Sequence, residues 1–209
     1  PFPKAYAQRL AMLDYQLNHR GELRDVATVR AYLRKPGIVD EVRGLADVLD
    51  DRIGYAPDVY PVPEWPLALR RHYSRREIVV AIGFAKVGEK GRIPQGGILK
   101  LPEQKRELLF VTLDKSAKSF SPSTQYRDYW ISDTLFHWET QGAASASKAS
   151  GKRYTESPGN GWRFFLFVRE NTEAMYEFFG EVVMKSWEGD RPIGVVWETQ
   201  TLAGASTTR

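Results

Sequence analysis

The spacing of apolar residues in the first third of the chain follows the period of an α-helix. Val42, Leu45, Leu49 and Ile53 recur every three or four residues, which places them on one face of a helix. Similar spacing occurs upstream of Pro36–Gly37, a pair of residues that ends helices. The pattern predicts three helices, over about residues 6–17, 23–33 and 42–53.

A proline-rich segment follows these helices and predicts a domain boundary. Residues 56–66 (APDVYPVPEWP) contain four prolines, and proline cannot donate a hydrogen bond to a regular ladder. We expect an extended linker there, with a helical region over residues 1–66 and a second domain over residues 67–209. Just beyond the linker, Ser74 and Glu77 have the spacing of a capping box, which predicts a short helix from about Arg75 to Ile82.

The rest of the chain has patterns typical of short strands. Short runs rich in β-branched and aromatic residues lie at 107–114, 162–169 and 192–199, with weaker candidates at 96–101 and 177–186. Residues 142–153 are small and polar, which predicts a mobile surface loop. We therefore expect an α+β fold, in which a helical N-terminal region precedes a small, strongly curved, β-barrel-like domain.

Charge changes the picture because it is distributed unevenly. The net charge of +4 is modest, but residues 71–127 carry twelve Lys and Arg against five Asp and Glu. Residues 128–209 carry eight basic against eleven acidic residues. A local basic excess is what attraction to nucleic-acid phosphates requires, although solvated surface charges give the same pattern.

Cysteine content and the chain ends restrict the class of protein. The chain has no cysteine, which excludes disulfides, thiolate metal sites and cysteine nucleophiles, and which fits a reducing cytoplasm. No apolar run reaches the length of a membrane span, and no secretory signal is visible, so we expect no membrane partner. Because the first residue is Pro1 and not methionine, we expect a piece of a longer protein.

The usual catalytic and cofactor motifs are absent from the sequence. The histidines His19, His72 and His137 are far apart, and no HExxH motif occurs. The sequence also lacks a GxSxG nucleophile motif and a GxxxxGK[ST] phosphate-binding loop. We therefore expect no catalytic residue, no metal and no cofactor.

Aromatic and polar residues are concentrated between residues 120 and 138. Six aromatic residues occur there, interleaved with hydroxyl, amide and imidazole groups. Flat rings stack on nucleic-acid bases, and the polar groups can bind a base edge or a phosphate. The alternative is an aromatic core, and we expect about half of these rings to be buried.

Several motifs, in their order along the chain, resemble one known domain family. They are YSRREI (73–78), LFVTLDKS (109–116), FSPSTQYRDYWIS (120–132), LFHWETQ (135–141), GKRY (151–154), FLFVRE (165–170) and the series from Phe178 to Glu198. Together they are similar to the uncharacterised C-terminal domain of bacterial superfamily-two (DEAD/DEAH-type) helicases, which often also carry a phospholipase-D-type nuclease. The strand-rich part also resembles PUA-like and SRA-like barrels, whose relatives bind flipped modified bases.

The resemblance implies a DNA-recognition module of a restriction- or defence-type helicase–nuclease, with DNA and the attached helicase and nuclease domains as its partners. The modification that it reads would lie on a base or on the backbone. The chain itself has no helicase or nuclease motif, so we expect it not to be an enzyme. Two alternatives stay open: a metal-independent nuclease that uses His137 with a nearby carboxylate, and a partner-docking module.

The candidate DNA contacts fall into three groups. Expected phosphate contacts are Arg75, Arg76, Lys115, Lys118, Arg127 and Arg153, the last beside the expected loop. Expected stacking rings are Tyr126, Tyr129, Trp130 and Trp138, and expected edge-reading groups are Ser121, His137 and Gln141. A flipped base requires both a stacking surface and an edge-reading group.

Overall fold

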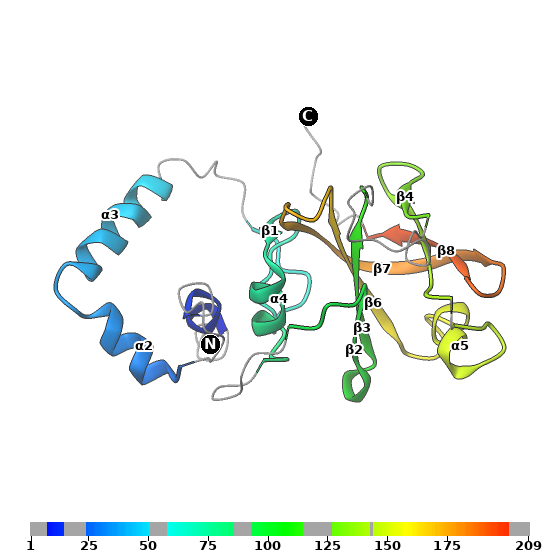
Figure 1. Ribbon diagram of the computed structural model, residues 1–209, viewed down its shortest axis with the longest axis horizontal. Helices are drawn as coiled ribbons and strands as arrows, with labels where there is room; N and C mark the ends of the chain where they lie inside the picture. The colour runs from blue at the N-terminus through cyan, green and yellow to red at the C-terminus, as the bar shows by residue number, and fades with distance from the viewer. Residues whose placement is uncertain are drawn as a thin grey trace. The chain divides into compact units, whose positions relative to one another are not determined.

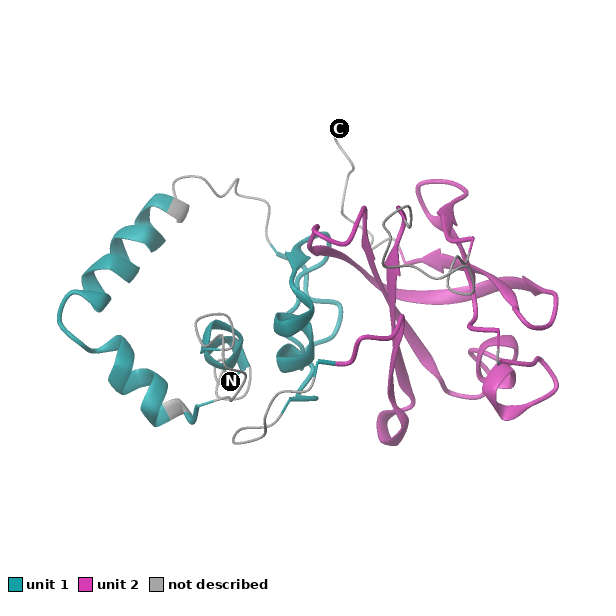
Figure 2. Cartoon of the chain, in the orientation of Figure 1, with its two compact units in different colours: residues 1–93 teal, residues 94–209 magenta. Residues whose placement is uncertain are grey.

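The computed structural model describes residues 8–14, 24–50, 58–85, 93–114, 127–142 and 144–200 of the chain. They belong to two compact units, unit 1 over residues 1–93 and unit 2 over residues 94–209 (Figure 2). The proline-rich segment at residues 56–66, which the sequence analysis places at a domain boundary, therefore falls within unit 1.

The helices of unit 1 are short, and side chains cap two of them. Residues 8–14 are helical, and α2 (Val26–Leu33) begins after Asp25, whose carboxylate accepts the backbone N–H of Thr28 at 2.9 Å. A helix start leaves backbone N–H groups without partners, and such a side chain satisfies one of them. α3 (Ile38–Asp50) follows, and further along come the two-residue β1 (His72–Tyr73) and the helix α4 (Arg75–Ala81).

The capping box predicted at the start of α4 is confirmed. The backbone N–H of Glu77 donates to the Ser74 hydroxyl at 3.2 Å, and the backbone N–H of Ser74 donates to the Glu77 carboxylate at 2.7 Å. The helix then buries Ile78, Val79 and Val80. Local sequence was sufficient here because both members of the box lie within one turn.

The expected helical N-terminal region is wrong. Its most regular apolar face, on α3, is exposed at Val42, Leu45 and Val48, so these residues do not form the core of a helical layer. The helices are short and scattered, and α5 (Ala149–Thr155) lies among the strands of unit 2 (Figure 1). Within the described ranges, no helix is both long and apolar enough to cross a membrane.

The strands of unit 2 form one mixed sheet in the order β2-β3-β6-β7-β8-β5-β4 (Figure 1). The pairing of β3 with β6 is parallel, and the other pairings along this path are antiparallel. A short 3-10 helix, Pro102–Gln104, joins β2 to β3. The strands are β2 (Ile98–Leu101), β3 (Arg106–Thr112), β4 (Tyr129–Trp130), β5 (Leu135–Glu139), β6 (Arg163–Arg169), β7 (Tyr176–Glu188) and β8 (Gly194–Thr199).

The expected barrel is also wrong, because the sheet is open. A barrel requires its two end strands to hydrogen-bond to each other, whereas β2 and β4 lie at opposite ends of the strand order. β4 has two residues, so it is too short to close a sheet. Register shifts in β7, near Phe178 and between Met184 and Ser186, mark irregularities of the kind that bend a strand.

The core of unit 2 is strongly aromatic. β3 and β6 read as nearly continuous apolar runs, and almost all of their residues are buried, as expected for strands covered on both faces. Against one face pack Trp138, Tyr154, Phe164 and Trp197, with ring centroids of neighbouring pairs 4.7–6.5 Å apart. The core therefore absorbs much of the aromatic content that the sequence shows.

The segment expected to be a mobile loop, residues 142–153, instead contains the start of α5. Ser145 and Gly151 are buried, and a Cβ atom added to Gly151 would lie 2.2 Å from the Ser145 carbonyl oxygen. Only glycine permits this close approach of helix and loop. At Gly151, the small residue that suggested flexibility is therefore required for tight packing.

Candidate functional site

The β4–β5 hairpin carries the central candidate residues, and strand alternation sorts them onto two faces. On β5, Phe136 and Trp138 are buried in the core, whereas His137 between them points to the opposite face. Successive side chains of a strand point to opposite faces, so the hairpin register places Tyr129 opposite His137 and Trp130 opposite Phe136. One exposed aromatic pair therefore lies outside the core.

The rings of Tyr129 and His137 are stacked. Their centroids lie 4.7 Å apart, the planes differ by 15°, and Tyr129 is 50% exposed. His137 Nδ1 lies 2.7 Å from the Arg127 carbonyl oxygen. Because a carbonyl only accepts, Nδ1 carries a proton, so in the neutral form of the ring Nε2 is the acceptor. The stack thus presents a flat surface with one open acceptor atom.

Side-chain hydrogen bonds hold the residues before β4 against β5. The backbone N–H of Arg127 donates to a Glu139 carboxylate oxygen at 3.0 Å, and the backbone N–H of Glu139 donates to Asp128 Oδ1 at 3.0 Å. With the His137–Arg127 bond, they fix the end of the short pairing at which β4 begins and β5 ends. The Arg127 side chain is exposed, and no described residue forms an ion pair with it.

On the other side of β5, the strand β8 has a glycine beside the histidine ring. Glu139 pairs with Gly194 in the β5–β8 register, and a Cβ atom added to Gly194 would lie 3.1 Å from His137 Nε2. Among the described residues, no donor or acceptor occupies Nε2. Any side chain larger than that of glycine at position 194 would therefore crowd this edge of the imidazole.

The two tryptophans that the sequence nominates as stacking rings pack toward the core. Trp138 is 5% exposed and contacts Tyr154 and Trp197. Trp130 is half-buried against Phe136 and Phe179, at centroid distances of 4.8 and 4.7 Å. The alternation of Phe136, His137 and Trp138 was a signal for this division that the sequence already contained.

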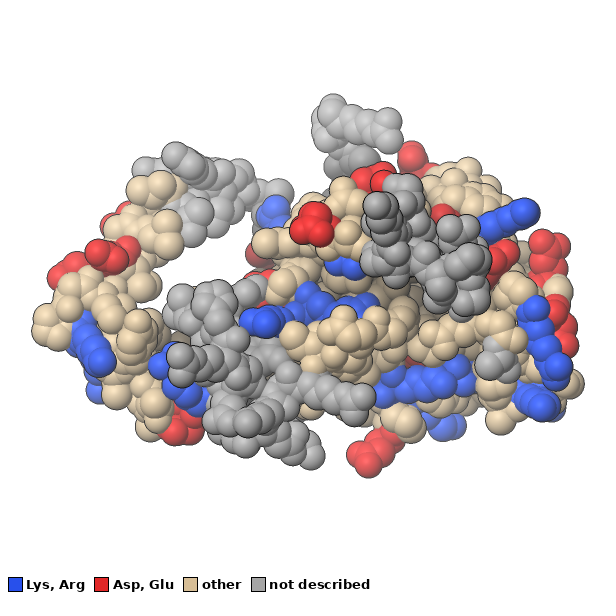
Figure 3. All heavy atoms as spheres, in the orientation of Figure 1, with Lys and Arg blue, Asp and Glu red and all other residues tan. Residues whose placement is uncertain are grey.

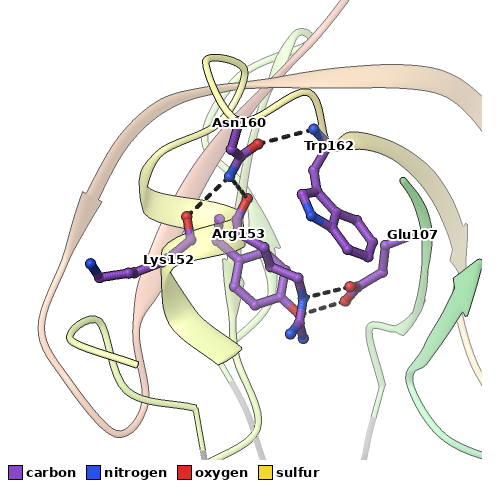
Figure 4. Close-up of polar contacts among 6 residues, drawn as sticks. Glu107, Lys152, Arg153, Asn160 and Trp162 are labelled. Atoms are coloured by element: carbon purple, nitrogen blue, oxygen red, sulfur yellow. Dashed lines mark hydrogen bonds and ion pairs between the residues drawn. The ribbon is translucent and has the colours of Figure 1, made fainter. Parts of the chain in front are cut away.

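Arg153 also has a role within the fold. Its Nε donates to the Glu107 carboxylate at 2.7 Å, with side-chain exposures of 11% and 0% (Figure 4). Its Nη2 donates to the Tyr154 hydroxyl at 2.7 Å, and that hydroxyl donates to the second Glu107 oxygen. Burial, and next the charge of Glu107, raise the pKa of Tyr154. A buried carboxylate requires such partners, so we do not assign Arg153 to a DNA contact.

The group Glu107–Arg153–Tyr154 joins α5 to the sheet, and Asn160 completes the attachment. The Asn160 amide donates to the carbonyls of Lys152 and Arg153 at 3.2 and 3.0 Å, and its oxygen accepts the backbone N–H of Trp162 at 3.0 Å (Figure 4). The Lys152 carbonyl also accepts the backbone N–H of Glu156 at 2.9 Å, so the amide adds a second bond there and a bond to the Arg153 carbonyl near the end of the helix.

The other predicted contacts are distributed over the chain. Arg75 and Arg76 begin α4 in unit 1 and are half-buried, and Gln141 is exposed after β5 in unit 2. Figure 3 shows Lys and Arg side chains in separate groups on the face that it draws, without one continuous basic surface among the residues shown. The predicted contacts Lys115, Lys118, Ser121 and Tyr126 lie outside the described residues.

The geometry around His137 differs from that of a nuclease centre. A general-base histidine is usually oriented by a carboxylate, whereas Nδ1 of His137 is bound to a backbone carbonyl. No carboxylate in the part of the chain that the structure describes is hydrogen-bonded to the ring. Among those same residues, no group of three or more His, Cys, Asp and Glu is placed to hold a metal ion.

Three residues of this site were not found from the sequence: Asp128, Glu139 and Gly194. Asp128 and Glu139 act across the hairpin, and a pairing of two residues leaves no periodic pattern from which to infer it. For Gly194 a signal existed, because a glycine inside a strand often marks a close approach of another group. Its neighbour is a ring from another strand, which local sequence does not reveal.

Comparisons with known proteins place the chain in a family. Three solved structures resemble it weakly. One is KRYPTONITE in complex with mCHH DNA, an H3(1–15) peptide and SAH (13% identity, TM-score 0.45, covering 99% of this chain and 45% of that one). Another is SUVH6 of Arabidopsis thaliana with SAM, with 10% identity and a TM-score of 0.42, covering 98% of this chain and 39% of that one. The third is KRYPTONITE with mCHG DNA and SAH, with 11% identity and a TM-score of 0.41, covering 98% of this chain and 44% of that one. The chain thus spans less than half the length of each of these proteins.

No curated protein matches the chain significantly. One family model matches residues 67–192, which is more than half of the chain. The predicted resemblance to an uncharacterised domain family is therefore confirmed, while the helicase context stays a prediction. The chain belongs to the family described as Domain of unknown function (DUF3427).

Proposed function

We propose that this chain is a DNA-binding recognition module that reads modified DNA, with a flipped base or an altered backbone as its target. The observation that carries the proposal is the exposed Tyr129–His137 stack. Stacking of one base on an aromatic side chain contributes about 1–3 kcal/mol, and an acceptor beside the ring supplies the selectivity that stacking lacks. In this proposal the exposed Arg127 contacts a phosphate near the stack.

The same proposal includes the basic and polar residues that precede β4. Lys115 and Lys118 would contact phosphates, Tyr126 would add a second ring, and Ser121 would bind a base edge. Arg75, Arg76 and Gln141 stay candidates for phosphate and edge contacts. Of the twelve basic residues between positions 71 and 127, five lie outside the described residues. Binding of this kind weakens steeply with salt, because each neutralised phosphate releases counterions.

We place the module in the cytoplasm, as part of a restriction- or defence-type machine whose motor and nuclease lie in other domains. The resemblance of the chain to helicase-associated domains supports this context. The orientation of His137 by a carbonyl, and not by a carboxylate, favours binding over cleavage by the chain itself.

A binding panel tests the proposal. The purified 209-residue chain is titrated against unmodified, base-methylated, hydroxymethylated, glucosylated and phosphorothioate duplexes at two salt concentrations. We expect tight, salt-sensitive binding without cleavage and with one duplex preferred. Tyr129→Ala should remove the preference, whereas Lys118→Ala should weaken binding to all duplexes alike. Equal binding to all duplexes would leave a backbone binder, and strand scission that is lost in His137→Ala would identify a nuclease.

One further observation favours a second candidate, a partner-docking module. The exposed apolar face of α3 lies beside acidic residues, Asp40 and Glu41 in its first turn and Asp47 further along. Acidic groups repel DNA phosphates, so this helix suits a protein surface, for which an attached helicase or nuclease domain is the proposed partner. Failure of the chain to bind any DNA at low salt would favour docking as its principal role.

A further inference from the structure

The Nε2 atom of His137, which has no hydrogen-bond partner among the described residues, indicates which chemical group the site reads. The Arg127 carbonyl holds the proton of the neutral imidazole on Nδ1, at 2.7 Å, which leaves Nε2 as an acceptor. We propose that Nε2 accepts a hydrogen bond from the exocyclic amino group of a nucleobase, as in cytosine or adenine, and so discriminates against bases with a carbonyl at that position. This inference rests on the proposed DNA-binding function.

The neighbouring strand determines how the amino group approaches. Gly194 has no side chain beside Nε2, and a Cβ atom there would lie 3.1 Å from the nitrogen and 3.7 Å from Cε1, so any larger residue would crowd this edge of the ring. The ring cannot readily turn away, because the Arg127 carbonyl holds one edge and Tyr129 covers one face. A ligand group must therefore approach in the plane of the imidazole, over Gly194.

Charges around this space favour an N–H donor over a phosphate or a carbonyl oxygen. The Glu188 stem lies 3.7 Å from the Cβ position of Gly194, and Glu139 is opposite Gly194 in the register of β5 and β8. Negative charge on this side of the ring repels an approaching anion or carbonyl oxygen, whereas it attracts amino hydrogens. An amino group has two hydrogens, so it can satisfy Nε2 and still face a carboxylate.

Stacking and edge reading use different sides of the aromatic pair. Tyr129 lies on β4 and Gly194 on β8, and these strands flank β5 on opposite sides. A base on the exposed side of Tyr129 and an amino group at Nε2 would therefore be two separate contacts, which neighbouring nucleotides can make. A variant at Tyr129 should consequently weaken binding and with it the preference for one modified duplex, whereas a variant at Nε2 should change only the choice between amino-bearing and carbonyl-bearing bases.

The experiment compares bases that differ by one group at one position. Duplexes carry cytosine or uracil, 5-methylcytosine or thymine, and adenine or hypoxanthine opposite an abasic site, and the dissociation constants for the whole chain are measured at pH 8.5, where imidazole is ordinarily neutral. We expect the amino-bearing member of at least one pair to bind about tenfold more tightly. Comparing the pyrimidine pairs with the purine pair identifies the source of the amino group.

Two variants test whether Nε2 is responsible. Gly194→Ala should close the approach to Nε2, and His137→Phe keeps a ring beside Tyr129 but has no acceptor; both should lower the preference to less than about twofold. Gly44→Ala is the matched control, because nothing lies within 4 Å of its Cβ position, and it should keep the preference. Thermal unfolding verifies that each variant is folded.

The outcomes separate this inference from the proposed function. DNA binding with equal affinity for both members of every pair would overturn the Nε2 assignment and leave a DNA-binding module. A preference that persists in folded Gly194→Ala and His137→Phe would also overturn it, because another group would then be reading the base. Absence of binding to every duplex at low salt would remove the proposed function together with this inference.

Discussion

Unit 2 contains two groups that combine an aromatic ring with ionisable side chains, and they differ in how completely their hydrogen bonds are satisfied. In the first, at the join of α5 and β3, both oxygens of the buried Glu107 carboxylate accept hydrogen bonds from Arg153 and Tyr154. In the second, on the β4–β5 hairpin, the half-buried His137 has one nitrogen bound and the other open. The sequence gives no warning of this difference, since both groups contain ordinary polar and aromatic residues.

The comparison teaches that completeness of hydrogen bonding, more than residue type, separates a structural group from a binding group. A buried charge without partners costs several kcal/mol, so the Glu107 group must be complete for the chain to fold. An acceptor that water can reach loses little free energy when it has no protein partner, so the fold does not require a partner for His137 Nε2.

Removing the carboxylate of the complete group should have the largest effect on folding. Glu107→Ala leaves the Arg153 guanidinium buried without its counter-ion, and it should lower the free energy of unfolding by about 3–5 kcal/mol. Urea denaturation measures this. Glu181→Ala removes the partner of Arg163, whose side chain is 42% exposed, and it should cost less than about 1 kcal/mol. Similar losses of unfolding free energy in both variants would contradict the greater importance of the buried ion pair.

Crowding the contact between α5 and its preceding loop should have the next largest effect. Gly151→Ala places a Cβ atom 2.2 Å from a backbone oxygen of Ser145 and 2.7 Å from Ile193 Cδ1, so the helix must move, at a cost of about 3 kcal/mol. Gly142→Ala serves as the control, because nothing lies within 4 Å of its Cβ position. Thermal unfolding that shows equal stability of the two variants would argue against a packed role for this segment.

Truncating rings on the two faces of the hairpin should separate binding from stability. Tyr129→Ala should leave unfolding nearly unchanged but weaken DNA binding about tenfold, which corresponds to about 1.4 kcal/mol. Trp130→Ala, one residue away, should mainly destabilise the fold, because its ring packs against Phe136 and Phe179. Fluorescence anisotropy and urea denaturation of both variants provide the test, and the reverse assignment would show that the core ring is the ligand contact.

The smallest effect concerns acid sensitivity at the loop before α5. The backbone N–H of Ala146 donates to Asp190 Oδ1 at 2.8 Å and lowers the pKa of Asp190 below its ordinary value of 3.8. The stabilisation is therefore fully present above pH 3.8 and is lost as the pH falls through the lower pKa of the folded state.

Asp190→Asn keeps an oxygen that can accept the Ala146 N–H but has no titrating charge. The variant should lose slightly less stability than the wild type between pH 5 and pH 2.5 in urea denaturation. A loss in the variant as steep as that in the wild type would show that protonation of Asp190 does not contribute to the acid sensitivity.

Much of the fold could be predicted wherever the information is local. The capping box of α4 and the apolar runs of β3, β6 and β8 were found because they depend on residues within one turn or one strand. The expected barrel and the helical region were wrong because they depend on which segments meet. Strand pairing is decided by contacts between distant residues, and a regular apolar face does not show whether anything covers it.

The candidate site was predictable to a similar degree. The aromatic segment did contain the exposed pair, but the register of β4 against β5 was needed to tell its buried rings from its exposed rings. The segment before β6 was misjudged for a related reason. Glu107 and Arg153 are 46 residues apart, so nothing near residues 142–153 indicated that a buried partner would hold them in a helix.

The parallel pairing of β3 with β6 has a consequence for synthesis of the chain. Arg169 reaches back to Thr112 across 57 residues, and the two strands form their ladder only after that length has been translated. At a translation rate of about 5–20 residues per second, the Leu, Phe and Val side chains of β3 lack their partners on β6 for several seconds. Such an apolar segment invites association with other nascent chains. A lower growth temperature or a co-expressed chaperone should therefore raise the soluble yield of this protein.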